Sequence, residues 1–221
     1  MNSVIKNLNK LFRTGVFVLI FLILVAGSLV SLATAYYTDR QMRAELLEKG
    51  RIIAKMVNTE SVARLSGSEA DLQSADYLRL KKRLMEVHQA ADKCRFVYLM
   101  GRDSDSRIFF YVDSEPPGSK DESPPGQFYD EASAEQHRAF STGQEATQGP
   151  TADRWGTWVS AIVPIFDAKS GKTIVLGMDI DQRMEDNYYQ PHCCPVGVDD
   201  CNTHCDCECA PCASAFPESG C

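Results

Sequence analysis

Thiol and imidazole groups, which are strong metal ligands, gather at the C-terminal end of this sequence. Eight of its nine cysteines lie between Cys193 and Cys221. Four of them stand close together near His192 and His204, which supplies the ligand types of a thiolate metal cluster. In an oxidising compartment the same cysteines would instead pair as disulfides. The candidate metal ligands are Cys205, Cys207, Cys209 and Cys212.

Groups of side chains that catalyse reactions are scarce in the rest of the sequence. It contains neither a Gly-x-Ser-x-Gly nucleophile motif nor a glycine-rich loop that would cradle a phosphate. His88 stands alone on a helix of mixed polarity and His137 on a short acidic one, where a histidine is usually a solvated or capping residue. We therefore expect neither catalytic residues nor a cofactor. The enzyme class that would fit best is an exported hydrolase.

Size and composition fit one folded domain beside a membrane segment. The chain has 221 residues, 44% of them apolar and 24% charged, so roughly 100 to 150 residues remain for one core. Its net charge is -7 and its isoelectric point is near 5.1. Because binding to nucleic acid phosphates needs clustered Lys and Arg, this composition argues against a nucleic-acid partner.

A membrane-spanning helix is predicted over residues 14–38, which are 25 consecutive residues without a formal charge. A bilayer needs only about 20 apolar residues in a helix. Because basic side chains are slightly in excess before this segment, residues 1–13 are placed in the cytoplasm. The alternative is a cleaved signal peptide with its cleavage site at Ala33-Thr34-Ala35, but the apolar run is longer than a typical signal core.

Two helices are predicted over residues 39–93. The first continues from the span to about Val57, with Met42, Leu46 and Ile53 on one stripe. Such a stripe either packs on the chain's own sheet or forms a dimer interface that transmits signals. The two kinds of packing can also occur at different positions along the same helix. The second helix is predicted to begin near Asp76 as its N-cap and to cover one face of the sheet.

An antiparallel sheet is predicted within residues 94–181. Residues 95–100 and 107–112 are rich in aromatic and β-branched side chains and flank a polar turn, as residues 155–166 and 173–180 do further along. Between these two hairpins, residues 113–127 contain two Pro-Pro-Gly motifs, which lack the N–H donors of a strand. Long ordered loops of this kind are often functional. A short helix is predicted from Tyr129 to Phe140.

Several motifs in this region resemble the extracytoplasmic PDC sensor domain, also called Cache-like, of bacterial membrane-bound histidine kinases and diguanylate cyclases. They occur in order over the part of the chain that ends near Asp181. The motifs are Phe96-Val97-Tyr98-Leu99-Met100-Gly101, Val112-Asp113-Ser114-Glu115-Pro116-Pro117-Gly118, Pro124-Pro125-Gly126-Gln127-Phe128-Tyr129-Asp130-Glu131, Gly149-Pro150, Asp153-Arg154-Trp155-Gly156-Thr157-Trp158-Val159-Ser160 and Leu176-Gly177-Met178-Asp179-Ile180-Asp181.

This resemblance implies an α+β, PAS-like fold with a central antiparallel sheet of about five strands flanked by helices. It also implies a periplasmic sensor domain anchored in the inner membrane, with output modules beyond a second span. No such module is recognisable in this sequence. We expect a single-pass receptor fragment that is truncated or frameshifted after the sensor.

The resemblance adds a third interpretation of the tail at residues 182–221, namely translation in a shifted reading frame. Shifted by one nucleotide, the codons of Met184 and Glu185 encode Trp followed by Lys or Arg. The codons that follow then encode mostly apolar residues, which is the Trp-basic junction and second span that the family would have there. Tails rich in Cys, Asp and Tyr always encode apolar residues when shifted, so the apolar stretch alone is weak support. The Trp-basic pair is the feature that best distinguishes a shifted frame from the other interpretations of the tail. We favour this interpretation, with a tail that is out of frame or disordered.

Candidate ligand-binding residues follow from the resemblance together with local chemistry. Aromatic walls with a few polar groups suit a small polar molecule, and Arg154 is placed to grip a carboxylate. The alternative is that Asp113 and Arg154 pair with each other and hold the Pro-rich loop. The candidates are Tyr98, Tyr111, Asp113, Ser114, Tyr129, Arg154, Trp155 and Thr157.

The function predicted from these observations is signal input. A small ligand of unknown identity would bind to the extracytoplasmic domain of a homodimer and shift the helix that enters the membrane. Such a module binds saturably and turns nothing over. The alternative is a membrane-tethered metal-binding or disulfide-rich protein that acts through its tail.

Overall fold

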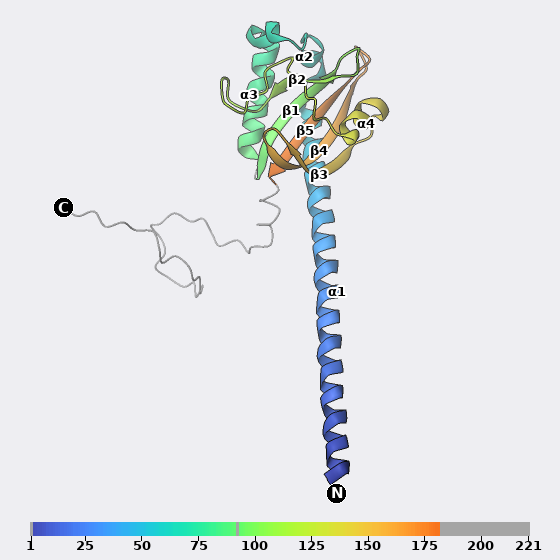
Figure 1. Ribbon diagram of the computed structural model, residues 1–221. Helices are drawn as coiled ribbons and strands as arrows, with labels where there is room; N and C mark the ends of the chain where they lie inside the picture. The colour runs from blue at the N-terminus through green and yellow to red at the C-terminus, as the bar shows by residue number, and fades with distance from the viewer. Residues whose placement is uncertain (1, 92, 182–221) are drawn as a thin grey trace, which may run out of the picture. The chain divides into compact units, whose positions relative to one another are not determined.

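The computed structural model describes residues 2–91 and 93–181 of the chain, with side chains from residue 13 onward. The predictions for the tail at 182–221, whether a shifted frame, a metal cluster or disulfides, lie outside the described residues. Figure 1 shows the order of the elements. Their bounds are α1 Asn2–Met56, α2 Thr59–Ala63, the 3-10 helix η1 Glu69–Gln73, α3 Ala75–Ala90, β1 Cys94–Arg102, β2 Ile108–Asp113, α4 Ala134–Thr142, β3 Ala146–Asp153, β4 Gly156–Asp167 and β5 Lys172–Asp181.

The strands form one antiparallel sheet in the order β2-β1-β5-β4-β3. The β4–β5 hairpin is in register over ten residue pairs. Its turn forms because the Asp167 carboxylate accepts the backbone N–H groups of Lys169 at 3.3 Å and Ser170 at 3.1 Å. The predicted class, α+β with a five-stranded antiparallel sheet, flanking helices and a long apolar N-terminal helix, is confirmed.

Among the strands of this sheet, β3 is the one that the residue pattern did not predict; it also did not predict the short helices α2 and η1. Its sequence is polar and contains Gly149-Pro150, joined by a cis peptide bond. Proline cannot donate to a strand ladder, so it is tolerated mainly at sheet edges and at bulges. Both conditions hold here, because β3 is the last strand in the sheet and its pairing with β4 shifts register between Gln148 and Thr151.

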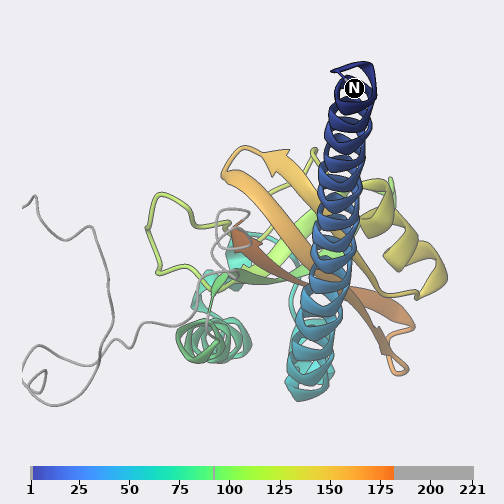
Figure 2. The ribbon, with the colours of Figure 1, turned by 90° about the horizontal axis from the view of Figure 1, so that it is seen from below.

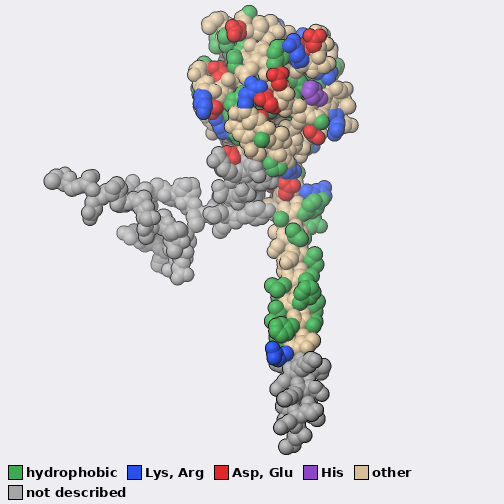
Figure 3. Space-filling model, viewed as in Figure 1, with side chains coloured by type: hydrophobic (Ala, Val, Ile, Leu, Met, Phe, Trp, Pro, Cys, Tyr) green, Lys and Arg blue, Asp and Glu red, His purple; other side chains and the backbone are tan. Residues whose placement is uncertain are grey.

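Helix α1 is continuous for 55 residues and changes its surroundings along its length. All side chains of residues 13–37 are exposed, and this helix is long and apolar enough to cross a membrane. Figure 3 shows apolar side chains gathered on that part of the helix. Further along, Met42, Leu46 and Ile53 are buried against the sheet. The predicted stripe therefore packs on the chain's own core.

The sheet has two covered faces. Helices α1 and α3 pack on one face, and α4 covers part of the other; Figure 2 shows the three helices arranged around the strands. Along β4, Val159 and Ala161 face the first layer, while Trp158 and Ile162 face the second. This period-two alternation follows from strand geometry. The candidate site lies on the second face.

Candidate functional site

Tyr98 is placed in the site by a glycine on the neighbouring strand. Tyr98 in β1 pairs with Gly177 in β5, and a Cβ atom at position 177 would lie 2.0 Å from Cε2 of the tyrosine ring. Because glycine has no side chain, the ring lies over β5 and reaches along it. The Tyr98 hydroxyl then donates a hydrogen bond to Oδ1 of Asp179 at 3.2 Å.

Asp179 is a buried carboxyl group in the middle strand of the sheet, with 4% of its surface exposed. It accepts hydrogen bonds from the hydroxyl groups of Tyr98 and Ser160, and Ser160 is its pairing partner in β4. Burial raises the pKa of Asp179 to about 7, although both hydrogen bonds favour the charged form and lower it; the negative charge of Asp153 also raises it. At neutral pH this carboxyl group is close to its titration midpoint.

Asp153 collects four hydrogen bonds at the end of β3. Its Oδ1 accepts the backbone N–H groups of Trp155 at 2.9 Å and Gly156 at 3.1 Å, and the indole N–H of Trp158 at 2.8 Å. Its Oδ2 accepts the hydroxyl of Tyr129 at 3.0 Å. Burial is the largest cause that raises the pKa of Tyr129, and the negative charge of Asp153 is the second. The carboxylate therefore fixes both the β3–β4 turn and the Tyr129 ring.

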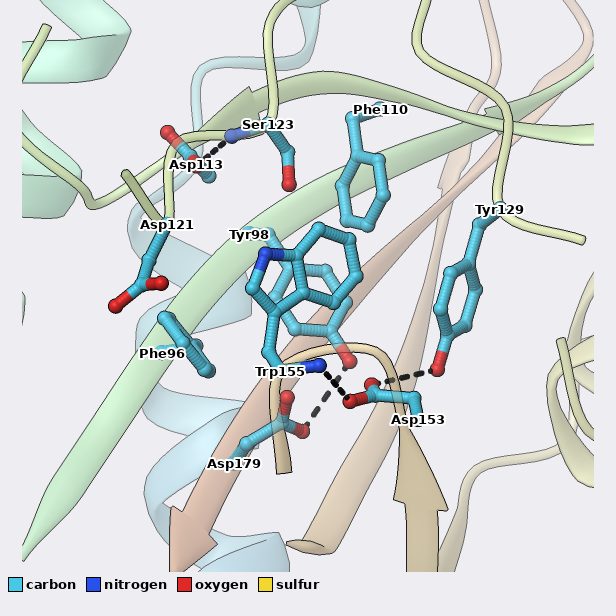
Figure 4. Close-up of a pocket in the computed structure, with 10 residues that line it drawn as sticks. All are labelled: Phe96, Tyr98, Phe110, Asp113, Asp121, Ser123, Tyr129, Asp153, Trp155 and Asp179. Atoms are coloured by element: carbon cyan, nitrogen blue, oxygen red, sulfur yellow. Dashed lines mark hydrogen bonds between the residues drawn. The ribbon is translucent and has the colours of Figure 1, made fainter. Parts of the chain in front are cut away.

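Aromatic rings wall the space above these two carboxyl groups, as Figure 4 shows. Phe110 lies at the centre, with ring centroids 5.5 Å from Tyr98, 5.6 Å from Tyr129 and 6.0 Å from Trp155. The rings of Tyr129 and Trp155 are 6.2 Å apart and inclined by 33°. Trp155 stands in the β3–β4 turn, so it is attached to a short loop rather than to the sheet.

The rings and carboxyl groups line a cavity of about 340 Å³, including its mouth. Much of this volume is open to solvent, and the innermost space holds about one water molecule in this conformation. A larger ligand therefore requires movement of a wall such as Trp155. The lining residues are Phe96, Tyr98, Phe110, Asp113, Asp121, Ser123, Tyr129, Asp153, Trp155 and Asp179.

The four carboxyl groups of the lining differ in their partners. Asp113 pairs with Lys81, and Asp121 pairs with Arg95 at 2.7 Å. Asp153 and Asp179 accept hydrogen bonds from uncharged groups, and within the described part of the chain neither forms a salt bridge. None of the described residues that line the cavity is basic. The two acidic groups in the inner part of the cavity therefore have no cationic partner among the described residues.

The Pro-rich loop is held at the cavity by a buried cation. Lys81 on α3 is 3% exposed and pairs with Asp113 at the end of β2 and with Glu122 in the loop, the latter at 2.9 Å. The second oxygen of Asp113 accepts the backbone N–H of Ser123 at 2.6 Å. This small network joins the helix, the strand and the loop.

Four of the eight predicted ligand residues line the cavity, namely Tyr98, Asp113, Tyr129 and Trp155. The other four lie elsewhere. Tyr111 packs on the opposite face of the sheet, and the Ser114 hydroxyl accepts the backbone N–H of Val97 at 3.0 Å. Arg154 donates two hydrogen bonds to Glu131, at 2.8 and 2.5 Å, and Thr157 pairs with Ala152 in the β3–β4 ladder. Ligand contact by any of the eight stays a prediction.

The alternative pairing of Asp113 with Arg154 is not found, because each has a different partner. Sequence reasoning did not pick out Asp153 and Asp179 as site residues. A signal for Asp179 existed, since an acidic residue inside the apolar run Leu176–Ile180 is unusual and buried charges normally have a reason. The remaining lining residues that were not predicted are Phe96, Phe110, Asp121 and Ser123.

Comparison with known proteins gives structural neighbours only. No family model matches the chain, and no curated protein matches it. Among solved structures it is similar to the sensory domain of the Campylobacter jejuni chemoreceptor Tlp3, with 14% identity and a TM-score of 0.48 over 71% of this chain and 60% of that one.

Two further neighbours are structures of the Tlp3 ligand-binding domain. The complex with L-valine has 14% identity and a TM-score of 0.46, and covers 71% of this chain and 59% of that one. The complex with 4-methylisoleucine has 14% identity and a TM-score of 0.49, and covers 71% and 57%. The chain thus spans about three fifths of the domains it resembles. All three neighbours are described as sensory or ligand-binding domains of this chemoreceptor.

Proposed function

We propose that this chain is a membrane-anchored signal-input domain whose cavity binds a small organic cation. The observation that carries the proposal is the pair Asp153 and Asp179, two carboxyl groups without a cationic partner in the described chain, enclosed by aromatic rings. Aromatic faces and carboxylates are the groups that attract ammonium ions in proteins. A bound cation would also offset the cost of burying the Asp179 charge.

The charge of the lining narrows the ligand class. L-valine, bound in one neighbouring structure, carries both an ammonium and a carboxylate group. The cavity offers carboxyl groups for the ammonium but no basic side chain among its described lining residues for the carboxylate, and Arg154 is paired with Glu131. The proposed ligands are therefore amines and quaternary ammonium compounds that lack a carboxylate.

A route for the signal runs through two adjacent strands. Asp179 in β5 pairs with Ser160 in β4, and the next residue of β4, Ala161, faces helix α1. A Cβ atom at Gly50 of α1 would lie 3.1 Å from Val163 and 3.4 Å from Ala161, so the helix is close against β4. A ligand that moves these strands would move α1, which we propose anchors the domain in the inner membrane. The output module would lie outside this chain.

The test is calorimetric titration of the full chain in detergent micelles with choline and with 3,3-dimethyl-1-butanol, its uncharged isostere. Choline should bind saturably, and the neutral isostere at least tenfold more weakly, because only the cation is attracted to the carboxyl groups and ring faces. Tetramethylammonium and 1,4-diaminobutane extend the series to other shapes.

The variant Asp179→Asn should weaken the binding of whichever cation binds. Asp105→Asn, which removes a charge from an exposed turn, should leave it unchanged. Equal binding of the charged and neutral isosteres, or no saturable binding of any of the three cations, would refute a cation site.

A further inference from the structure

A second cavity lies between α2 and α3 and has the opposite electrostatic character. It encloses about 420 Å³, including its mouth. Three of the residues that line it are arginines, and none of its described lining residues is acidic. The lining residues are Asn58, Ser61, Arg64, Arg79, Leu80 and Arg83.

The arginines are held in place by the helices that carry them. Arg79 and Arg83 are four residues apart on α3, so they lie on the same side of the helix. Arg64 follows α2 and donates two hydrogen bonds to Asp76, at 2.6 and 2.8 Å, and one to the Ser61 hydroxyl at 3.2 Å. Arg79 donates to the same carboxylate at 2.9 Å. One acidic group thus positions two guanidinium groups at the rim.

The charges around this cavity do not cancel. Asp76 is the single carboxylate that pairs with Arg64 and Arg79, and within the described residues Arg83 forms no ion pair. Three positive charges and one negative charge leave a net charge of about two positive units. Each guanidinium also has five N–H donors, of which Arg64 and Arg79 use only some. Like charges gathered at a concave surface favour an anion.

The geometry points to an anion site between α2 and α3 that binds a small multivalent oxyanion such as phosphate or sulfate. Guanidinium groups match the oxygen pairs of such anions by donating two parallel hydrogen bonds. The side chains of Arg64 and Arg79 are 55% and 67% exposed, so the binding is screened by salt and is modest in strength.

The position of the cavity separates a free anion from a lipid headgroup. The predicted span ends at Thr38, and α1 continues to Met56 just before the cavity. Eighteen helical residues at 1.5 Å each place the cavity about 27 Å beyond the span. The headgroup layer is about 5 to 8 Å thick on each side of the hydrocarbon core, so lipids of that membrane do not reach the site.

The experiment measures phosphate and sulfate binding to the full chain by calorimetry at constant ionic strength, adjusted with chloride. Saturable binding of at least one of these anions is expected, and Arg83→Gln should weaken it at least fivefold. The matched control is Arg138→Gln on α4, an exposed arginine away from the cavity, which removes the same charge and should leave the affinity unchanged. Both variants replace exposed side chains, and the fluorescence of Trp155 and Trp158 checks that they fold.

Three outcomes would overturn the inference. The first is no saturable binding of either anion, and the second is equal weakening of binding by Arg83→Gln and Arg138→Gln. The third is that Arg83→Gln weakens binding to nanodiscs of phosphatidylglycerol but not binding of the free anions. None of these outcomes bears on choline binding, so failure of the anion site and failure of the cation site are distinguishable.

Discussion

Replacement of Asp179 by Asn should change the pH dependence of stability in a specific direction. Burial raises the pKa of Asp179 from 3.8 to about 7 in the folded chain, whereas the unfolded chain keeps the ordinary value. Between these two pH values the folded protein binds one proton more than the unfolded protein. Its stability therefore falls as the pH rises from about 4 to 7. An asparagine at this position does not titrate, so the variant lacks this loss.

The size of the effect follows from the difference between the two pKa values. About three pH units at 1.36 kcal/mol each correspond to about 4 kcal/mol once the pH exceeds 7. Relative to low pH, the free energy of unfolding of the wild type is lower by about 1.5 kcal/mol at pH 5 and by about 4 kcal/mol at pH 8. The stability of Asp179→Asn relative to wild type should thus increase by about 2.5 kcal/mol between these pH values.

Urea unfolding of the full chain in detergent, followed by tryptophan fluorescence, measures this difference. Both tryptophans, Trp155 and Trp158, lie beside the site, so the signal reports on this domain. Comparing the two pH values cancels any constant cost of the amide group. Asp105→Asn on an exposed turn serves as the control and should show no such trend. A difference between Asp179→Asn and wild type that is the same at pH 5 and pH 8 would show that Asp179 is not held in a charge-excluding site.

Three further predictions concern the scaffold of the site. Lys81→Met leaves Asp113 buried without its cation and should destabilise the domain by about 3–5 kcal/mol in urea unfolding. The control Lys82→Met, on the exposed side of α3, should change stability by less than about 0.5 kcal/mol, and equal effects of the two variants would contradict a buried network. Gly177→Ala forces the Tyr98 ring away and should lower stability by about 1–3 kcal/mol in the same assay, and a neutral result would contradict the close packing of the ring on β5. Residues 39–181 produced alone should unfold in one cooperative transition followed by circular dichroism, and a gradual transition would place the domain boundary elsewhere.

Much of the fold could be predicted because its signals are local. Aromatic and β-branched runs marked β1, β2, β4 and β5, and the polar turns between them have compositions that form hairpins. Helix boundaries were less accurate. The predicted start of α3 near Asp76 is in fact capped by Ser74, whose hydroxyl accepts the Tyr77 N–H, and α4 begins after Ser133 rather than at Tyr129. Strand β3 was missed because its pairing depends on β4 and on its edge position, which its own residues do not encode.

The site was predictable only where chemistry is visible in single residues. Tyr98, Asp113, Tyr129 and Trp155 were predicted from the motif resemblance together with the chemistry of aromatic walls and polar groups, and they line the cavity. The roles of the acidic residues depend on distant partners, since Tyr98 and Asp179 are 81 positions apart in the chain. Arg154 was predicted to bind the carboxylate of a ligand, whereas in the structure it donates to Glu131, 23 positions away. Charge compensation of this kind is a property of the folded chain.

The unbroken backbone of α1 has a consequence for how its two ends are oriented. An α-helix turns by about 100° per residue, so the orientation of the apolar segment about the helix axis is fixed relative to the side of α1 that packs on β4. Inserting one residue between Thr38 and Gln41 would turn the domain by that angle about the helix axis and lift it by about 1.5 Å. Seven inserted residues, close to two full turns, would nearly restore the original azimuth.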